Sequence, residues 1–121
     1  MPSLVSQKVE DVLIVYFKDA RILDEATIQP IGRELLALAD GCEDRKLLLN
    51  FEEVKFMTSA MIGKIMSLNK KCKADEIDLK LCGICKEIME IFTMLKLNKV
   101  LDMQKTEEKA MAAFQKKGFF G

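Results

Sequence analysis

The sequence of 121 residues contains no histidine, and this absence excludes a large part of enzyme chemistry. Without imidazole there is no Ser-His or Cys-His activation of a nucleophile, and no imidazole ligand for a metal ion. A zinc site would need all four cysteines, which are irregularly spaced at Cys42, Cys72, Cys82 and Cys85. We therefore expect a protein that is not an enzyme, with no catalytic residue, metal site or cofactor.

The sequence also lacks an excess of one charge and a long apolar run. Nineteen basic residues balance nineteen acidic ones, so there is no positive field to attract nucleic acid or an anionic membrane. No stretch reaches the ~18 apolar residues of a membrane-spanning helix, and residues 1–5 do not begin an apolar export segment. We expect a cytoplasmic protein with reduced cysteines that binds neither nucleic acid nor membrane.

Half of the residues are hydrophobic, which is enough for one well-packed core at this length. No linker or repeat interrupts the chain, so we expect a single domain over residues 1–121. The last segment, residues 115–121, departs from the pattern of the rest, and we expect it to be a flexible tail.

The apolar pattern alternates between strand and helix. Strand patterns occur at residues 4–9, 12–17, 47–51, 77–81 and 100–103, the first two joined as an antiparallel hairpin. Helical spacing predicts helices over residues 28–41, 58–72, 88–95 and 106–114. Since most crossovers contain a helix, we predict an α/β fold with a mixed, mostly parallel sheet of about five strands and about four helices.

Pro30 leaves the start of the first helix open. The helix begins either near Gln29, with the proline in its first turn, or just after Asp24, with a bend at the proline. Gly41 is a suitable residue for its end.

Two adjacent hydroxyl residues, Thr58 and Ser59, lie between a predicted buried strand and the second helix. One reading is an N-cap, in which a side-chain oxygen accepts from a free amide of the first turn and contributes ~1 kcal/mol. A helix N-terminus also stabilises added negative charge, so a hydroxyl there suits phosphorylation. A single serine can serve as cap first and as phosphoacceptor later.

The second helix has a wide apolar stripe. Met61, Ile65 and Leu68 form its centre, and Ile62 and Met66 border it. The bordering pair either widens the core-facing stripe or forms an exposed docking surface, for which methionine is well suited.

Cys82 and Cys85 form a CxxC motif between a predicted strand and a predicted helix. A helix N-terminus lowers the pKa of a nearby thiol, which allows redox chemistry. Cysteine is also a common small core residue, and the motif comes late in the chain with no proline after it. Packing is therefore the main interpretation and a thiol-redox protein the alternative.

Several motifs together resemble the sulphate-transporter and anti-sigma-antagonist (STAS) domain, and within it the stand-alone bacterial anti-sigma factor antagonists. The matching segments are Leu23-Asp24, Leu47-Leu48-Leu49-Asn50-Phe51, Val54-Lys55-Phe56-Met57-Thr58-Ser59-Ala60-Met61-Ile62-Gly63, Leu79-Lys80-Leu81-Cys82-Gly83 and the helix start at Thr106. They occur in the family's order and cover residues 4–114.

This resemblance implies a partner switch that regulates transcription. An unphosphorylated antagonist binds an anti-sigma factor that is also a serine kinase, and phosphorylation of one serine ends the binding; a serine phosphatase is the expected second partner. Carried onto this chain, the phosphoacceptor is Ser59, with Thr58 as a second candidate. The expected partner-binding residues are Asp24, Thr58, Ser59, Met61, Ile62 and Met66.

The chain departs from the family pattern at two of these positions. Thr58 replaces the usual acid before the phosphoserine, which removes a negative charge from the kinase-facing surface. Met61 replaces a glycine, which adds bulk to the first helical turn. An alternative function is therefore a scaffold subunit of a larger sensory or stress-signalling assembly that is never phosphorylated. We expect a monomer or a weak dimer.

Overall fold

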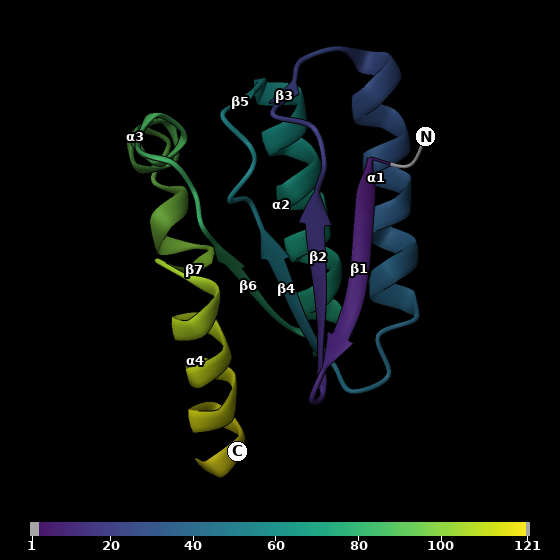
Figure 1. Ribbon diagram of the computed structural model, residues 1–121, viewed down its shortest axis with the longest axis vertical. Coiled ribbons are helices and arrows are strands. Elements are labelled where there is room, and N and C mark those ends of the chain that lie inside the picture. Colours follow the sequence, from purple (N-terminus) through teal and green to yellow (C-terminus); the bar gives the residue numbers. More distant parts are fainter. Residues whose placement is uncertain (1–2, 121) are drawn as a thin grey trace.

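A computed structural model describes residues 3–120, with side chains described for residues 3–115 (Figure 1). In chain order the elements are β1 (Leu4–Val9), β2 (Val12–Phe17), β3 (Arg21–Ile22), α1 (Glu25–Asp40), β4 (Lys46–Asn50), β5 (Phe56–Met57), α2 (Ser59–Ala74), β6 (Asp78–Cys82), α3 (Lys86–Met94), the 3-10 helix η1 (Leu97–Lys99), β7 (Asp102–Gln104) and α4 (Glu107–Phe120). Within residues 3–120, no helix combines the length and the apolar character needed to cross a membrane.

The main sheet has five strands in the order β1-β2-β4-β6-β7. β1 and β2 form the predicted antiparallel hairpin, in which Val9 pairs with Val12. The remaining neighbours are parallel, because each of these strands is reached through a crossover that contains a helix. The predicted fold class, a mixed and mostly parallel sheet with four α-helices, is confirmed.

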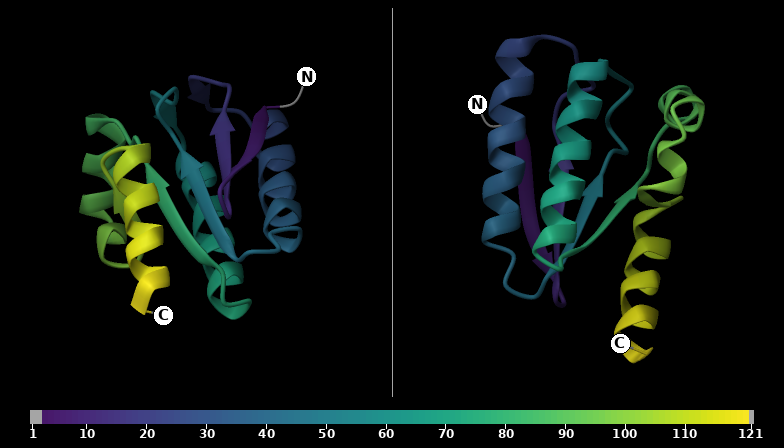
Figure 2. Two further views of the ribbon diagram at one scale, coloured as in Figure 1. Left: turned by 60° about the horizontal axis from the view of Figure 1, so that its bottom comes forward. Right: turned by 180° about the vertical axis from the view of Figure 1, so that it is seen from behind.

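The sheet separates two apolar cores of unequal size. The larger core lies on the face covered by α1, α2 and α3, and the smaller core lies under α4 on the other face. Alternate residues of one strand point into different cores: Leu47 and Leu49 into the larger, Leu48 into the smaller. Figure 2 shows α1 and α2 together on one side of the sheet, with α4 apart from them.

Helix α1 begins directly after Asp24, so of the two predicted starts the one near Gln29 is wrong. The carboxylate of Asp24 accepts a hydrogen bond from the amide of Thr27 at 3.0 Å and caps the helix. This cap holds the first turn although Pro30, inside the helix, has no amide proton to donate. Gly41 ends the helix at its C-cap, as predicted.

The C-terminal third differs from the sequence prediction in two details. The last strand is Asp102–Gln104 rather than 100–103, because η1 occupies residues 97–99 and leaves Val100 exposed. In α3, Ile88 and Phe92 are buried, whereas Ile91, and Leu95 directly after the helix, are exposed. The apolar residues of α3 therefore do not all face the core.

The predicted flexible tail, residues 115–121, is described only in part. Helix α4 continues to Phe120, and Gln115 donates to the carboxylate of Glu10 at 2.7 Å. The side chains of residues 116–120, and all of residue 121, lie outside the described residues. Flexibility of this segment stays a prediction.

A buried lysine lies between the sheet and α4. The side chain of Lys80 in β6 is only 4% exposed, and its ammonium group lies 2.5 Å from the carboxylate of Asp102 in β7 and 3.5 Å from Asp78. The same ammonium group lies 5.0 Å from the centre of the Phe114 ring in α4. A buried charge is tolerated only when it is paired, so this lysine ties β7 and α4 to β6.

We predict that Asp102→Asn lowers the free energy of unfolding by ~2 kcal/mol, because the buried ammonium of Lys80 loses its nearest anionic partner. Urea denaturation followed by circular dichroism measures the change. Lys80→Met, which removes the buried charge but keeps the length of the side chain, serves as the control and should cost less. Unchanged stability of Asp102→Asn would show that the ion pair contributes nothing.

Candidate functional site

The candidate site lies where two helices begin side by side. A second, two-stranded sheet, which the sequence did not predict, pairs β3 with β5 in parallel. The amide of Thr58 extends this pairing by donating to the carbonyl of Ile22 at 3.2 Å. Since α1 follows β3 and α2 follows β5, the pairing brings both helix N-termini to the same end of the molecule (Figure 1).

Thr58, not Ser59, is the N-cap of α2. Its hydroxyl oxygen accepts from the amide of Met61 at 3.4 Å, while Ser59 is the first helical residue. The prediction that Ser59 caps this helix is therefore wrong, because the capping oxygen belongs to Thr58. Ser59 is exposed and Thr58 is partly buried, so the hydroxyl of Ser59 is open to modification.

The electrostatic environment of Ser59 is set mainly by the helix end. The first turn of α2 contains no acidic residue, so no carboxylate offsets the partial positive charge of its free amides. Across the β3–β5 pair, Asp24 is exposed and accepts from Thr27, and this hydrogen bond keeps the pKa of its carboxyl below the usual value. Asp24 therefore supplies a negative charge beside the start of α2.

Exposed apolar side chains lie next to this helix start. Leu23 is 43% exposed and Phe56 is 49% exposed, and the guanidinium of Arg21 lies 4.7 Å from the centre of the Phe56 ring. Arg21 and Phe56 are paired residues of β3 and β5. Sequence reasoning missed Arg21, Leu23 and Phe56 as a surface, because only the β3–β5 pairing brings the three side chains together.

Three predicted partner-binding residues lie elsewhere than expected. Met61 is fully buried and Ile62 is only 5% exposed, so neither side chain forms a docking surface. Met66 is partly buried and packs against the larger core. The wide stripe of α2 is therefore core-facing, and the bulk that Met61 adds to the first turn lies in the core rather than at the surface. Asp24, Thr58 and Ser59 remain at the surface.

The two cysteines of the CxxC motif have different environments. Cys82 is fully buried in the smaller core, and desolvation raises the pKa of its thiol to about 12. Cys85 is partly buried against the larger core, and its thiol lies 3.7 Å from the carbonyl oxygen of Lys55. A dithiol redox site needs two thiols that can react, so the burial of Cys82 counts against the thiol-redox alternative.

The chain matches a known protein family and several solved structures. The model of the STAS domain matches residues 3–110, and the chain therefore belongs to the STAS domain family. An anti-sigma-factor antagonist (STAS) domain protein from Planctomyces limnophilus has a similar structure, with 21% identity, a TM-score of 0.81, and 91% of this chain and 96% of that chain covered.

Two further solved structures share the fold at lower identity. The Bacillus cell fate determinant SpoIIAA in its phosphorylated form is 14% identical, with a TM-score of 0.69 and coverage of 92% of this chain and 98% of that chain. A chain from a structure of the stressosome, described as a signal integration and transduction hub, is also 14% identical. Its TM-score is 0.72, and 94% of this chain and 98% of that chain are covered. The chain thus has the fold of the anti-sigma factor antagonists.

We predict that Thr58→Ala lowers the free energy of unfolding by ~1 kcal/mol, because the first turn of α2 loses its side-chain cap. Ser59→Ala should change it by less than ~0.5 kcal/mol, since Ser59 is exposed and does not cap the helix. Thr58→Ser keeps the capping oxygen and is the control. Urea denaturation measures all three, and a larger loss for Ser59→Ala than for Thr58→Ala would contradict the cap assignment.

Proposed function

We propose that this chain is an anti-sigma factor antagonist, a non-enzymatic module in a bacterial partner switch. In its unphosphorylated form it sequesters an anti-sigma factor with serine kinase activity and thereby regulates transcription. Phosphorylation of Ser59 ends the binding, and a serine phosphatase restores it. The observation that carries the proposal is the exposed hydroxyl of Ser59 at the N-terminus of α2, whose first turn contains no acidic residue.

The same surface supplies both adhesion and its control. Leu23 and Phe56 are exposed apolar residues in the segments that lead into α1 and α2, and aromatic residues are frequent anchors of protein interfaces. A phosphate on Ser59 adds nearly two negative charges, and a partner that buried the site would have to desolvate them. The helix end stabilises the phosphate, whereas the phosphate destabilises the complex with the docked partner.

Thr58 changes the electrostatics of this switch. A carboxylate at this position would lie beside Ser59 on the surface that meets the kinase, whereas Thr58 uses its oxygen to cap the helix and carries no charge. Asp24 is then the carboxylate beside the start of α2 on the α1 side. We infer that the cognate partner presents less positive charge to this site than a partner that meets two carboxylates.

A second candidate function is a scaffold subunit in a stress-signalling assembly that is not phosphorylated. The absence of a carboxylate at Thr58 favours it, and so does the structural similarity to a stressosome chain. The two candidates differ in one observable property, which is whether a serine kinase from the same genome transfers phosphate to Ser59.

We predict that incubation with that kinase and ATP places phosphate on Ser59, and that Ser59→Asp binds the kinase about tenfold more weakly than wild type. Ser59→Ala should bind as wild type does, because it adds no charge. Mass spectrometry locates the phosphate, and isothermal titration calorimetry measures the affinities. Ser67→Asp, on an exposed position of α2 two turns further on, is the matched control and should not weaken binding.

Two results of this experiment would exclude or change the proposed switch. If all of these variants bound with one affinity and no phosphate appeared on Ser59 or Thr58, the switch would be excluded and the scaffold function favoured. Phosphate on Thr58 alone would identify Thr58, rather than Ser59, as the phosphoacceptor.

We also predict that Phe56→Ala weakens kinase binding about tenfold, since an aromatic anchor beside Ser59 is lost. Its ring is half exposed, so the free energy of unfolding should fall by no more than ~1 kcal/mol. Leu36→Ala, an apolar residue of similar partial exposure on α1, is the control. Equal affinity of Phe56→Ala and wild type would place the docking surface elsewhere.

A further inference from the structure

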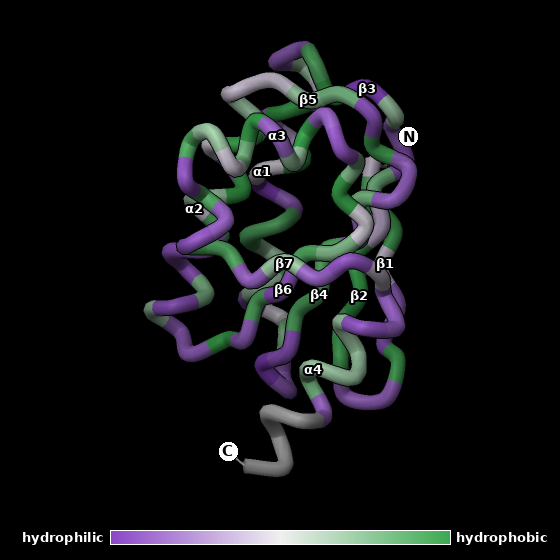
Figure 3. Tube along the Cα trace, turned by 90° about the vertical axis from the view of Figure 1, so that its left-hand side faces the viewer, coloured by the Kyte–Doolittle hydropathy of each residue, from purple (hydrophilic) through white to green (hydrophobic). Residues whose placement is uncertain are grey.

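An open apolar groove lies between α3 and β7, apart from the Ser59 site. Its volume is about 720 Å³, within the range of ~300–1,000 Å³ that is usual for small-molecule sites. Ile84, Met89, Met94 and Met103 supply its apolar walls. Figure 3 faces this side of the molecule, with α3 and β7 toward the reader.

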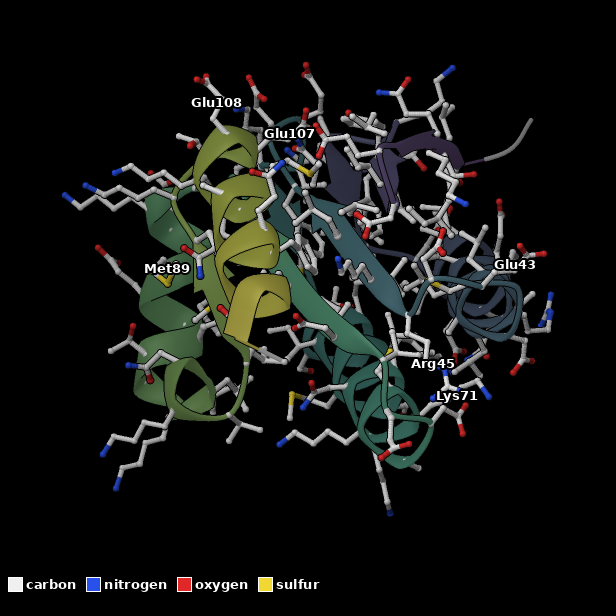
Figure 4. The ribbon with its side chains drawn as sticks, turned by 90° about the horizontal axis from the view of Figure 1, so that it is seen from below. Glu43, Arg45, Lys71, Met89, Glu107 and Glu108 are labelled. Carbon is white, nitrogen blue, oxygen red and sulfur yellow. The ribbon has the colours of Figure 1, made fainter. Side chains whose placement is uncertain are left out.

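The groove is separate from the core contacts of α3. Ile88 and Phe92 are the buried residues of this helix, whereas Met89 is partly buried and Met94 is 76% exposed. Methionine side chains are flexible and polarisable, so they adapt to apolar ligands of varied shape. Figure 4 labels Met89 on α3 and Glu107 at the start of α4.

The charges of the groove are unevenly distributed along its length. Lys86 is the first residue of α3, and Lys105 follows β7, where its carbonyl accepts from the amide of Gly83 at 3.3 Å. Both lysines therefore lie at the end of the groove where β6 and β7 end. Among the described residues, neither ammonium group forms a salt bridge, although Lys86 is near enough to Glu87 to help lower the pKa of that carboxyl.

The opposite end of the groove is uncharged. Thr93 and Met94 line it at the last turn of α3. Glu90 is the one acidic residue of the lining and lies one turn after Lys86. The lining thus changes along the groove from cationic to apolar. A partner helix would instead need a polar rim along both sides of an apolar floor.

We propose that this groove binds a free single-chain fatty acid. The carboxylate lies between Lys86 and Lys105, and the acyl chain extends along Met103 and Met89 toward Met94. Charge complementarity at one end and apolar walls along the rest fit this ligand. The site is distinct from Ser59, and the inference does not depend on the phosphorylation switch.

The start of α3, beside the groove, also contacts the segment that leads into β5. The thiol of Cys85, at the start of α3, lies 3.7 Å from the carbonyl oxygen of Lys55, directly before β5. Phe56 follows in β5 and is one of the exposed residues beside Ser59.

The test is a titration of the full chain, with methyl-labelled methionine, with decanoate below its micelle concentration. We expect saturable 1:1 binding that shifts the methyl signals of Met89, Met94 and Met103 but not those of buried Met61 or Met57. Affinity should rise about threefold for each methylene added from octanoate to dodecanoate. Decanol, which lacks the carboxylate, should bind more weakly.

Two variants separate the apolar and the charged parts of the site. Met89→Glu should weaken decanoate binding at least about tenfold, because a carboxylate enters the groove. The double variant Lys86→Gln, Lys105→Gln should weaken decanoate about fivefold and leave decanol unchanged. Lys70→Gln, Lys73→Gln, two exposed lysines of α2, is the matched control and should leave both affinities unchanged.

Three results would overturn the proposal. One is the absence of saturable binding, and another is binding that Met89→Glu does not weaken. The third is a shift of the Met89 and Met103 signals with protein concentration alone, which would show that a second copy of the chain covers the groove. Because none of these measurements uses the kinase, their failure is distinguishable from failure of the switch at Ser59.

Discussion

The parallel pairing of β3 with β5 is the constraint on which the candidate site depends. Two residues from each strand, with hydrogen bonds that include one from the amide of Thr58 to the carbonyl of Ile22, hold the starts of α1 and α2 together. Helix dipoles and caps act only within the first turn, so this alignment concentrates Asp24, Thr58 and Ser59 at one end of the molecule. Without it, Leu23 and Phe56 would belong to separate loops.

The division of roles between Thr58 and Ser59 follows from the same alignment. The cap must come from the last residue before the helix, and the backbone of Thr58 is extended there by its bond to Ile22. Ser59 is then the first helical residue, with an exposed hydroxyl that no structural role occupies. A module built in this way can be modified at Ser59 with little loss of fold stability.

The opposite face of the sheet is packed differently. In the part of the chain that the structure describes, α4 alone covers it, and the small apolar core is supplemented by polar contacts that fix the start of this helix. The hydroxyl of Tyr16 and the amide of Asn50 both donate to one carboxylate oxygen of Glu107, at 2.8 and 2.9 Å. Figure 4 shows Glu107 and Glu108 at this helix start. Lys80 under Phe114 anchors the next turns, so α4 is held by charge as well as by burial.

Local patterns in the sequence were sufficient for the order of the main-sheet strands and the α-helices, the hairpin, the mostly parallel sheet and the hydroxyl residues at the start of α2. These features depend on the periodicity of neighbouring residues and on capping, which act over a few positions. The resemblance to the STAS family, also based on short ordered motifs, indicated Ser59 and Asp24 as candidate site residues.

Only the tertiary structure decided which side chains share a surface. Residues such as Arg21 and Phe56 are far apart in the chain, and a two-residue strand has too few positions to produce a readable pattern. The burial of Met61 and Ile62, the pairing of Lys80 with Asp102 and the groove at Met89 likewise depend on contacts between distant elements. Periodicity shows that a helix has an apolar side, but the packing of neighbouring elements determines how wide that side is and what remains exposed.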